Sequence, residues 1–260
     1  MLLVLATFST AAKAEWSVGG GLENYRWAET IADAPLTPKE TGLRLAANLK
    51  WTQDGDRGLL FGYRGKLYFG RVHYDTYTQQ TYTPISTHTV YVGATHEGQL
   101  LYRTDAGNYK LDYVGGLGYD NWQRSIENNG FYQIESYSIF FLRGGINLDQ
   151  LMHNPGFHGG GGLKYPFWTA ENAHLNEQGY YSNPIITPGK DFSLYAELGY
   201  RISERWDVIG YYDSWRFKRS NTVSSDDSTG TWLIWQPKSS MDTFGLRAMY
   251  SFQTRQAVIR

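Results

Sequence analysis

The sequence has 260 residues with 24 Lys and Arg, 25 Asp and Glu and no Cys, which gives a formal net charge of −1 at pH 7. A chain so close to neutral has no global field that recruits nucleic acid, so we expect no nucleic-acid partner. The absence of Cys excludes disulfides and thiolate metal sites, and we expect no metal and no cofactor. Aromatic residues make up 16% of the chain and Gly occurs 29 times, which favours strands over helices.

The first residues, MLLVLATFSTAAKA, form a short apolar run that ends in small residues. Ala12-Lys13-Ala14 matches the pattern of a signal-peptide cleavage site, so we predict a signal peptide over residues 1–14 and a mature chain from Glu15. A short buried segment or anchor is the alternative. No later stretch approaches the roughly 18 uninterrupted apolar residues of a transmembrane helix.

Hydrophobicity alternates with a period of two residues along most of the remaining chain, which predicts β-strands with one apolar and one polar face. The clearest case is residues 41–75, where two alternating runs flank Asp54-Gly55-Asp56, a sequence that favours a tight hairpin. The ninth run is ambiguous in phase, and a bulge is one explanation. Ten strands are expected near residues 16–27, 43–51, 59–75, 88–102, 109–120, 133–148, 157–168, 192–201, 206–217 and 243–252.

Short connections follow the second, fourth and eighth strands, whereas long ones follow most odd-numbered strands, notably 169–190 and 219–240. Alternating short and long loops on an even number of antiparallel strands is typical of outer-membrane barrels, with short turns periplasmic and long loops outside. We therefore predict an all-β chain that forms a transmembrane antiparallel up-and-down β-barrel over residues 15–252, followed by a short C-terminal extension at 253–260. Ten strands are favoured, and eight or twelve are the alternatives.

Aromatic side chains gather near both expected ends of the strands, as in the girdles of membrane barrels. A soluble lipocalin-like barrel, the alternative fold, has an apolar interior and no use for paired girdles. In hydrocarbon every backbone N–H and C=O needs a partner within the protein, so a sheet spans a membrane only if it closes. The girdle candidates are Trp16, Trp51, Tyr102, Tyr109, Trp206 and Phe252 at the short-turn end, and Trp27, Trp122, Trp168 and Trp215 at the long-loop end.

The chain resembles the Gram-negative outer-membrane β-barrel proteins as a broad class, over nearly all of the mature sequence. Its last strand, MDTFGLRAMYSF, is similar to the C-terminal assembly signal of that class, which alternates apolar residues and ends in an aromatic; here QTRQAVIR continues beyond Phe252. The resemblance implies an outer-membrane location with a periplasmic N-terminus. It also implies contact with outer-membrane lipid and lipopolysaccharide, and insertion by the barrel-insertion machinery. We expect a monomer.

Ten strands enclose a narrow lumen, and the polar faces place charges of both signs inside it. Because an unpaired charge there is costly, we expect the charges to pair across the lumen and leave it mostly plugged. A narrow channel for small solutes, anions included, is the alternative. The expected lumen network is Arg44, Arg64, Lys66, Glu97, Lys110, Asp112, Glu135, Arg143, Glu197, Arg201 and Arg247.

The omptin surface proteases resemble this chain in strand number and loop asymmetry, and they use an Asp pair and an Asp-His pair at the extracellular rim to activate water. The one Asp-x-Asp here, at residues 54–56, lies in a turn predicted on the opposite side. His73, Asp75 and His88 flank one long loop. Both histidines, however, fall on the alternate positions of their strands that face lipid, that is, they have the lipid-facing parity. A rim hydrolase built on these three residues is therefore a second alternative, and exposed rim histidines are favoured.

Two further features are of interest. His158 precedes the run Gly159–Gly162, and we expect it to fill space in the lumen rather than bind a metal. The loop over residues 219–240 carries Trp232-Leu233-Ile234-Trp235, an apolar segment that either folds over the barrel mouth or binds a partner or lipid. We favour a non-enzymatic surface or structural protein that acts through its extracellular loops.

Overall fold

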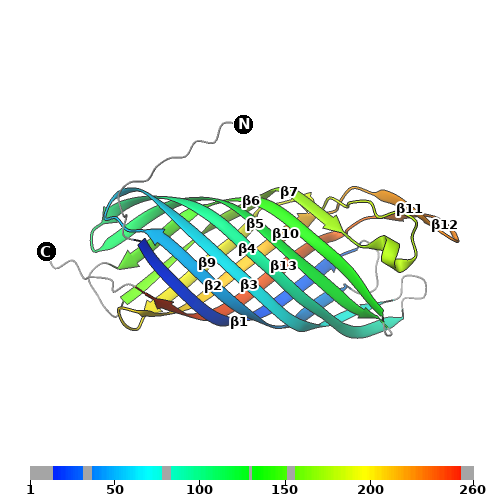
Figure 1. Cartoon of the computed structure of the whole chain (residues 1–260), viewed down its shortest axis with the longest axis horizontal. Helices are drawn as coiled ribbons and strands as arrows, with labels where there is room; N and C mark the ends of the chain where they lie inside the picture. The colour runs from blue at the N-terminus through cyan, green and yellow to red at the C-terminus, as the bar shows by residue number, and fades with distance from the viewer. Residues whose placement is uncertain (1–13, 32–36, 78–82, 129–130, 151–155, 253–260) are drawn as a thin grey trace.

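The structure, a computed structural model, describes residues 14–31, 37–77, 83–128, 131–150 and 156–252. Within them, ten antiparallel strands run obliquely around one axis and form a closed barrel (Figure 1). Closure comes from β13, which pairs with β1 on one side and with β10 on the other. The barrel strands are β1 (Ala14–Thr30), β2 (Lys39–Gln53), β3 (Gly58–Tyr77), β4 (Pro84–Ala106), β5 (Tyr109–Asn128), β6 (Phe131–Gln150), β7 (Gly156–Asn172), β9 (Ser193–Arg201), β10 (Trp206–Lys218) and β13 (Lys238–Ser251).

The remaining elements lie between the barrel strands at the long-loop end. They are η1 (Leu175–Gln178), β8 (Gly189–Lys190), β11 (Val223–Asp227) and β12 (Gly230–Ile234). β11 and β12 pair as a separate hairpin that projects past the end of the barrel (Figure 1). No helix in the described part of the chain is long and apolar enough to cross a membrane. The predicted signal peptide, apart from Ala14, and the predicted C-terminal extension lie outside the described residues.

The two faces of the sheet alternate in polarity as the two-residue period predicts. Large apolar side chains point outward around the whole barrel; Leu43, Leu67 and Phe244, for example, are 62, 60 and 60% exposed. The lumen instead contains buried charged residues such as Glu23 and Arg44. A soluble barrel has the reverse arrangement, with its apolar face inside, so the lipocalin-like alternative does not fit this chain.

The bulge lies in β7, not in β10 where the ambiguous phase of the sequence placed it. The register between β6 and β7 shifts between Phe140 and Phe141, opposite Phe167, whereas β10 pairs with β9 and β13 without a shift. The phase of β10 is unclear in the sequence because its lumen-facing residues near the long-loop end, Trp215 and Phe217, are apolar. They belong to a cluster that fills the lumen at that height.

Glycine allows close approaches inside this narrow barrel. A Cβ on Gly118 of β5 would lie 2.1 Å from Cζ of Phe141, so the missing side chain is what lets the Phe141 ring fill the lumen. A Cβ on Gly162, in the glycine-rich run of β7, would lie 2.1 Å from the carbonyl oxygen of Gly144. These glycines serve packing between neighbouring strands, as expected for glycine within a sheet.

Candidate functional site in the lumen and at the long-loop end

A cavity of about 130 Å³ occupies the half of the lumen nearer the short turns. Lys50, Arg201 and Asp207, which lie close to the short turns after β2 and β9, contribute to its wall. The cavity is rich in charge, and the positive charges outnumber the negative ones. Its charged lining residues, His158 aside, are Lys50, Arg64, Lys66, Arg143, Lys164, Arg201 and Arg247, and Glu97, Asp149, Glu197, Asp207 and Asp213.

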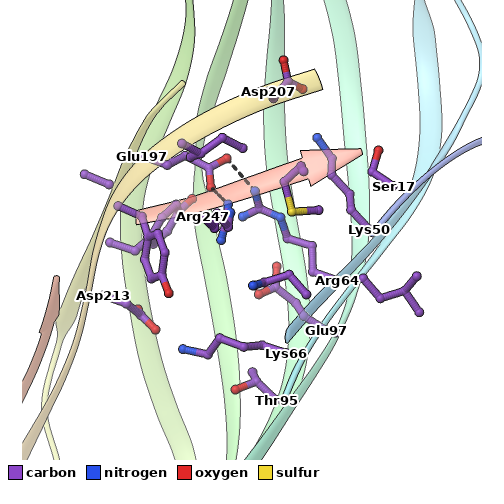
Figure 2. A pocket seen from close by; sticks show the side chains of 18 of the residues that line it. Ser17, Lys50, Arg64, Lys66, Thr95, Glu97, Glu197, Asp207, Asp213 and Arg247 are labelled. Atoms are coloured by element: carbon purple, nitrogen blue, oxygen red, sulfur yellow. Dashed lines mark hydrogen bonds and ion pairs between the residues drawn. The ribbon is translucent and has the colours of Figure 1, made fainter. Parts of the chain in front are cut away.

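Glu197 on β9 lies at the centre of this wall and binds two guanidinium groups (Figure 2). Arg64 from β3 donates to one carboxylate oxygen at 2.5 Å, and Arg247 from β13 donates to the other at 2.7 Å. The contact with Arg64 crosses the lumen from β3 to β9. One carboxylate thus holds together three strands and leaves a local excess of positive charge.

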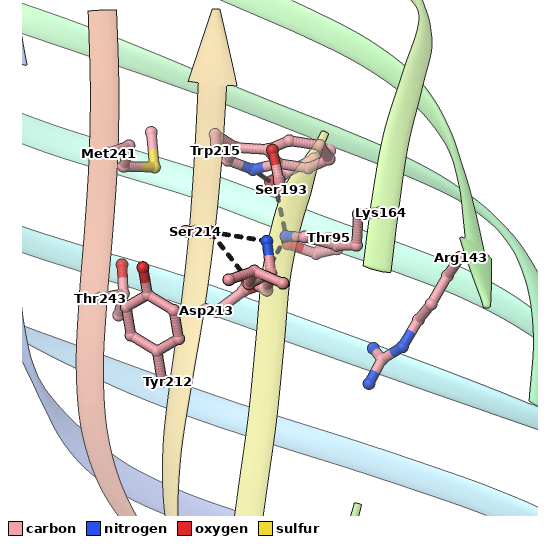
Figure 3. Close-up of polar contacts among 12 residues, drawn as sticks. Thr95, Arg143, Lys164, Ser193, Tyr212, Asp213, Ser214, Trp215, Met241 and Thr243 are labelled. Atoms are coloured by element: carbon pink, nitrogen blue, oxygen red, sulfur yellow. Dashed lines mark hydrogen bonds and ion pairs between the residues drawn. The ribbon is translucent and has the colours of Figure 1, made fainter. Parts of the chain in front are cut away.

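Two further ion pairs line the same cavity. Arg143 on β6 lies 3.0 Å from Glu97 on β4. Lys164 on β7 lies 2.5 Å from Asp213 on β10, and its ammonium group is 3.7 Å from the centre of the Trp215 ring (Figure 3). The cation–aromatic contact offsets part of the cost of removing the ammonium group from water.

On the long-loop side of the cavity, Glu23 on β1 binds both Arg44 at 2.7 Å and Lys66 at 2.9 Å. The hydroxyl of Tyr211 donates to the same carboxylate at 2.7 Å. Glu23 was not among the predicted network residues, although its parity on the first strand places it inside. The carboxylate of Glu23 supplies the negative charge that pairs with Arg44 and Lys66, for which the predicted lumen network contained no such partner.

An aromatic cluster fills the lumen from mid-height to the long-loop end. The Trp122 and Tyr137 rings stack with centroids 4.9 Å apart, and Trp27 lies 5.7 Å from Tyr137. We call this cluster the aromatic plug. It consists of Tyr25, Trp27, Ala46, Tyr68, Val72, Tyr91, Trp122, Tyr137, Ile139, Phe141, Trp215, Phe217 and Met241, all buried.

Arg124 on β5 and the three carboxylates around it, those of Glu29, Glu40 and Glu135, form a charged layer within the plug, which we call the Arg124 layer. The Arg124 side chain is 1% exposed and lies 3.1 Å from Glu40, 3.2 Å from Glu135 and 3.4 Å from Glu29. Only Glu135 of these four belongs to the predicted network. Arg124 shares the inward parity of Lys110 and Asp112, which was the available signal in the sequence.

A fourth carboxylate, that of Glu171 on β7, is buried beside this layer, and its Oε2 has no hydrogen-bond partner. This layer lies beyond the apolar band on the barrel exterior. The residues next to Glu40, Arg124 and Glu171 in the sequence point outward at the same height, and most of them are polar: Lys39, Thr41, Gln123, Ser125, Ala170 and Asn172. Burial, together with the nearby carboxylate of Glu135, raises the pKa of Glu171 well above its usual range.

Three of the predicted girdle residues are misassigned. Trp27, Trp122 and Trp215 point into the lumen and belong to the aromatic plug, with at most 2% of their surfaces exposed. Their position near the strand ends suggested a girdle, but their parity, opposite to that of the apolar exterior residues, places them inside. The other large rings do lie on the exterior: Trp16, Tyr102, Tyr109, Trp168, Trp206 and Phe252 are exposed and Trp51 is half-buried.

The remaining residues of the predicted network pair near the short-turn end. Lys110 lies 2.9 Å from Asp56 in the β2–β3 turn. Asp112 binds Arg103 at 2.7 Å, and Arg201 binds Asp149 at 2.9 Å. The partners come from turns and strand ends, where parity in the sequence is hardest to assign.

His73 and His88 face each other across β3 and β4 on the outer surface, with ring centroids 5.6 Å apart. Nε2 of His73 lies 2.9 Å from Asp75 and 3.1 Å from the Ser86 hydroxyl. A nucleophilic relay needs the carboxylate and the hydroxyl on opposite ring nitrogens, whereas here both contact Nε2. The three predicted candidates therefore meet, but outside the lumen and without a relay geometry. The described residues contain no cluster of His, Asp and Glu able to hold a metal.

At the long-loop end, the β7–β9 connection packs against the β11–β12 hairpin, and we call residues 173–188 and 223–235 together the loop platform. Its small core consists of Ala173, Leu175 and Ile186, against which Val223 and Ile234 pack. Backbone and side-chain bonds join the two segments, including Tyr181 N–H to the Asp226 carbonyl at 2.7 Å. Three large side chains remain exposed on the hairpin and just after it: Trp232, Leu233 and Trp235.

No protein-family model matches the chain, and no curated protein sequence matches it. Among solved structures, the chain is similar to the outer membrane protease OmpT from Escherichia coli, with 13% identity, a TM-score of 0.51 and coverage of 95% of this chain and 99% of that one. It is also similar to the transport unit of the autotransporter AIDA-I from Escherichia coli, with 10% identity, a TM-score of 0.50 and coverage of 96% and 93%. At these identities the likeness concerns the fold: the chain is a ten-stranded β-barrel of the outer-membrane type.

Proposed function

We propose that this chain is a closed outer-membrane barrel that acts as a surface or interaction protein through its long-loop end. The supporting observation is the aromatic plug, which fills the lumen around the buried Arg124 layer. A conducting pore needs a continuous polar path of sufficient width, and the packed rings interrupt it. The function then lies in what the barrel presents at its surface.

The proposal places the barrel in the outer membrane of a Gram-negative bacterium, as a monomer with short turns and N-terminus in the periplasm. Outer-membrane lipid and lipopolysaccharide surround the apolar exterior, and the insertion machinery assembles the barrel. The exterior rings at the short-turn end, such as Trp16 and Trp206, support this placement, because amphipathic rings favour a membrane–water interface. The loop platform then faces the cell exterior.

The loop platform is the proposed contact surface for a partner. Trp232, Leu233 and Trp235 are exposed on a hairpin whose other side is fixed by the platform core. Large exposed aromatic groups on a fixed element are typical of binding surfaces. Their substitution therefore affects partner contact and leaves the barrel intact.

Two measurements test the proposal. Planar-bilayer recordings of the refolded chain, with folding verified by heat-dependent gel mobility, should give a silent baseline; steady openings would contradict a closed lumen and favour the channel alternative. An epitope inserted after Thr229, in the β11–β12 turn, should be labelled on intact cells. The same epitope after Gly107, in the β4–β5 turn, should be labelled only after the outer membrane is permeabilised, and the reverse pattern would contradict the orientation.

The channel alternative is favoured by the excess of Lys and Arg around the cavity, which attracts anions. It also requires the aromatic plug to move. The rim-hydrolase alternative receives less support, because His73 and Asp75 lie on the outer surface without a relay geometry.

A further inference from the structure

We propose that the cavity in the short-turn half of the lumen binds a small anion that carries a phosphate or carboxylate group. This inference is independent of the surface role, because it concerns the other end of the barrel. The cavity wall carries seven Lys and Arg side chains against five Asp and Glu side chains. A lumen wall with two surplus positive charges favours an anionic occupant.

Positive charge gathers around one carboxylate of the wall, that of Glu197. Glu197 binds both Arg64 and Arg247, so one carboxylate serves two guanidinium groups. The side chain of Lys50 lies on the same wall (Figure 2). Planar guanidinium groups match the oxygen spacing of phosphate and carboxylate groups, so an anion in front of Arg64 and Arg247 can bind both without displacing Glu197.

Buried donors without partners give a second, independent argument. Nε of Arg247, Nε of Arg143 and Nδ2 of Asn48 are buried, have no hydrogen-bond partner and belong to residues that line the cavity. All three are donors, and the oxygens of a phosphate or carboxylate group supply acceptors. Leaving a buried donor unsatisfied is costly, so an acceptor at this site is favourable.

Other buried groups at the cavity do not alter this balance. Nε2 of His158 and Nε of Arg201 lie 3.6 and 3.7 Å from Asp207, so the carboxylate of Asp207 offsets the positive charge in this part of the wall. The site for the anion is therefore the region bounded by Asn48, Lys50 and the two arginines on Glu197.

The size and position of the cavity limit the ligand. One water needs roughly 10–15 Å³ of such space, so about 130 Å³ accommodates an anion the size of phosphate or a short dicarboxylate. The aromatic plug closes the lumen on the long-loop side, so the anion enters from the short-turn end.

Isothermal titration of the refolded full chain in detergent micelles tests the proposal, with inorganic phosphate and succinate as separate probes and sodium chloride at equal ionic strength as the control. We expect saturable one-site binding of at least one probe. If phosphate alone binds, the site recognises a tetrahedral oxyanion; if succinate alone binds, it recognises a carboxylate. A response that chloride reproduces, or no saturable response to either probe, would overturn the proposal.

The variants Arg247→Gln and Lys50→Gln should each weaken binding at least tenfold. Lys50→Gln serves as the safeguard if Arg247→Gln does not fold, because Arg247 is one of the two ion-pair partners of Glu197. Arg71→Gln, on the outer surface beside Glu127, is the matched control and should bind as the native chain does. Unchanged affinity in both cavity variants would place any binding elsewhere and contradict the assignment. The titration gives the same answer whether or not the barrel conducts.

Discussion

Arg124 on β5 and Glu40 on β2 lie 3.1 Å apart across the lumen, although 84 residues separate them in the sequence. Arg124 also contacts Glu29 and Glu135, so a single buried guanidinium compensates carboxylates from β1, β2 and β6. Charged groups inside this barrel thus share counter-ions. Nearer the short turns the roles are reversed, because the single carboxylate of Glu197 pairs with two arginines, Arg64 and Arg247.

Replacing Arg124 should therefore destabilise the barrel strongly. In Arg124→Leu, three buried carboxylates lose their shared partner, and breaking a buried ion pair typically costs about 3–5 kcal/mol. Urea unfolding in micelles, followed by tryptophan fluorescence, measures this. The control Arg71→Gln removes an exposed pair with Glu127 and should change the free energy of unfolding by less than about 1 kcal/mol. Equal effects of the two substitutions would contradict the buried network.

The buried carboxylate of Glu171 should make stability depend on pH. Its pKa is raised in the folded chain, so the folded state holds a proton that the unfolded state has lost above the ordinary Glu pKa of about 4.3. The contribution of Glu171 to stability is therefore largest below that pH and is lost as pH rises through the raised pKa. Glu171→Gln should flatten this fall and raise stability at pH 7. Parallel pH profiles of the free energy of unfolding for the two proteins would refute the assignment.

Tryptophan quenching distinguishes the plug from the exterior. In single-tryptophan variants reconstituted with brominated lipids, Trp168 and Trp206 should be quenched because their rings lie on the exterior. Trp27, Trp122 and Trp215 should remain bright, since they are buried in the lumen. Strong quenching of Trp27 or Trp122 would restore the girdle that the sequence suggested.

The loop platform should respond differently to its buried and exposed residues. Trp232→Ser and Trp235→Ser should leave the resistance of the β11–β12 hairpin to limited proteolysis unchanged, because both side chains are exposed and neither belongs to the platform core. Ile234→Ser should increase cleavage, because Ile234 packs against the platform core. Faster cleavage in the two Trp variants, with none in Ile234→Ser, would be inconsistent with this packing.

The sequence predicts the barrel well because membrane barrels impose a simple rule. Leu43, Leu67 and Phe244 alternate with polar neighbours, since one face contacts lipid and the other the lumen, so a period of two residues gives strands and faces directly. The rule weakens where the lumen itself becomes apolar. Trp215 and Phe217 made β10 ambiguous for that reason. The bulge near Phe167 in β7 is marked in the sequence by Pro166, because proline within a sheet is found at edges and bulges.

The site was predicted less completely, because parity places a residue inside but does not select its partner. Arg64 and Glu197 were expected in the lumen, yet their contact depends on barrel diameter and strand tilt, which the sequence does not give. Glu23 and Arg124 had the correct parity and were left out of the network. The three tryptophans of the plug were assigned by distance along the strand. The alternation already placed Trp27 and Trp122 inside, whereas Trp215 lies in β10, whose phase the sequence leaves ambiguous.

The conductance of one variant tests the closed lumen most directly. In Trp27→Ala/Trp122→Ala, two large rings are removed from the aromatic plug, so planar-bilayer recordings should show openings that the native chain lacks. Trp168→Ala removes an exterior ring and should stay silent like the native chain. If the native chain itself conducts steadily, with the same conductance as the double variant, the aromatic plug does not close the lumen.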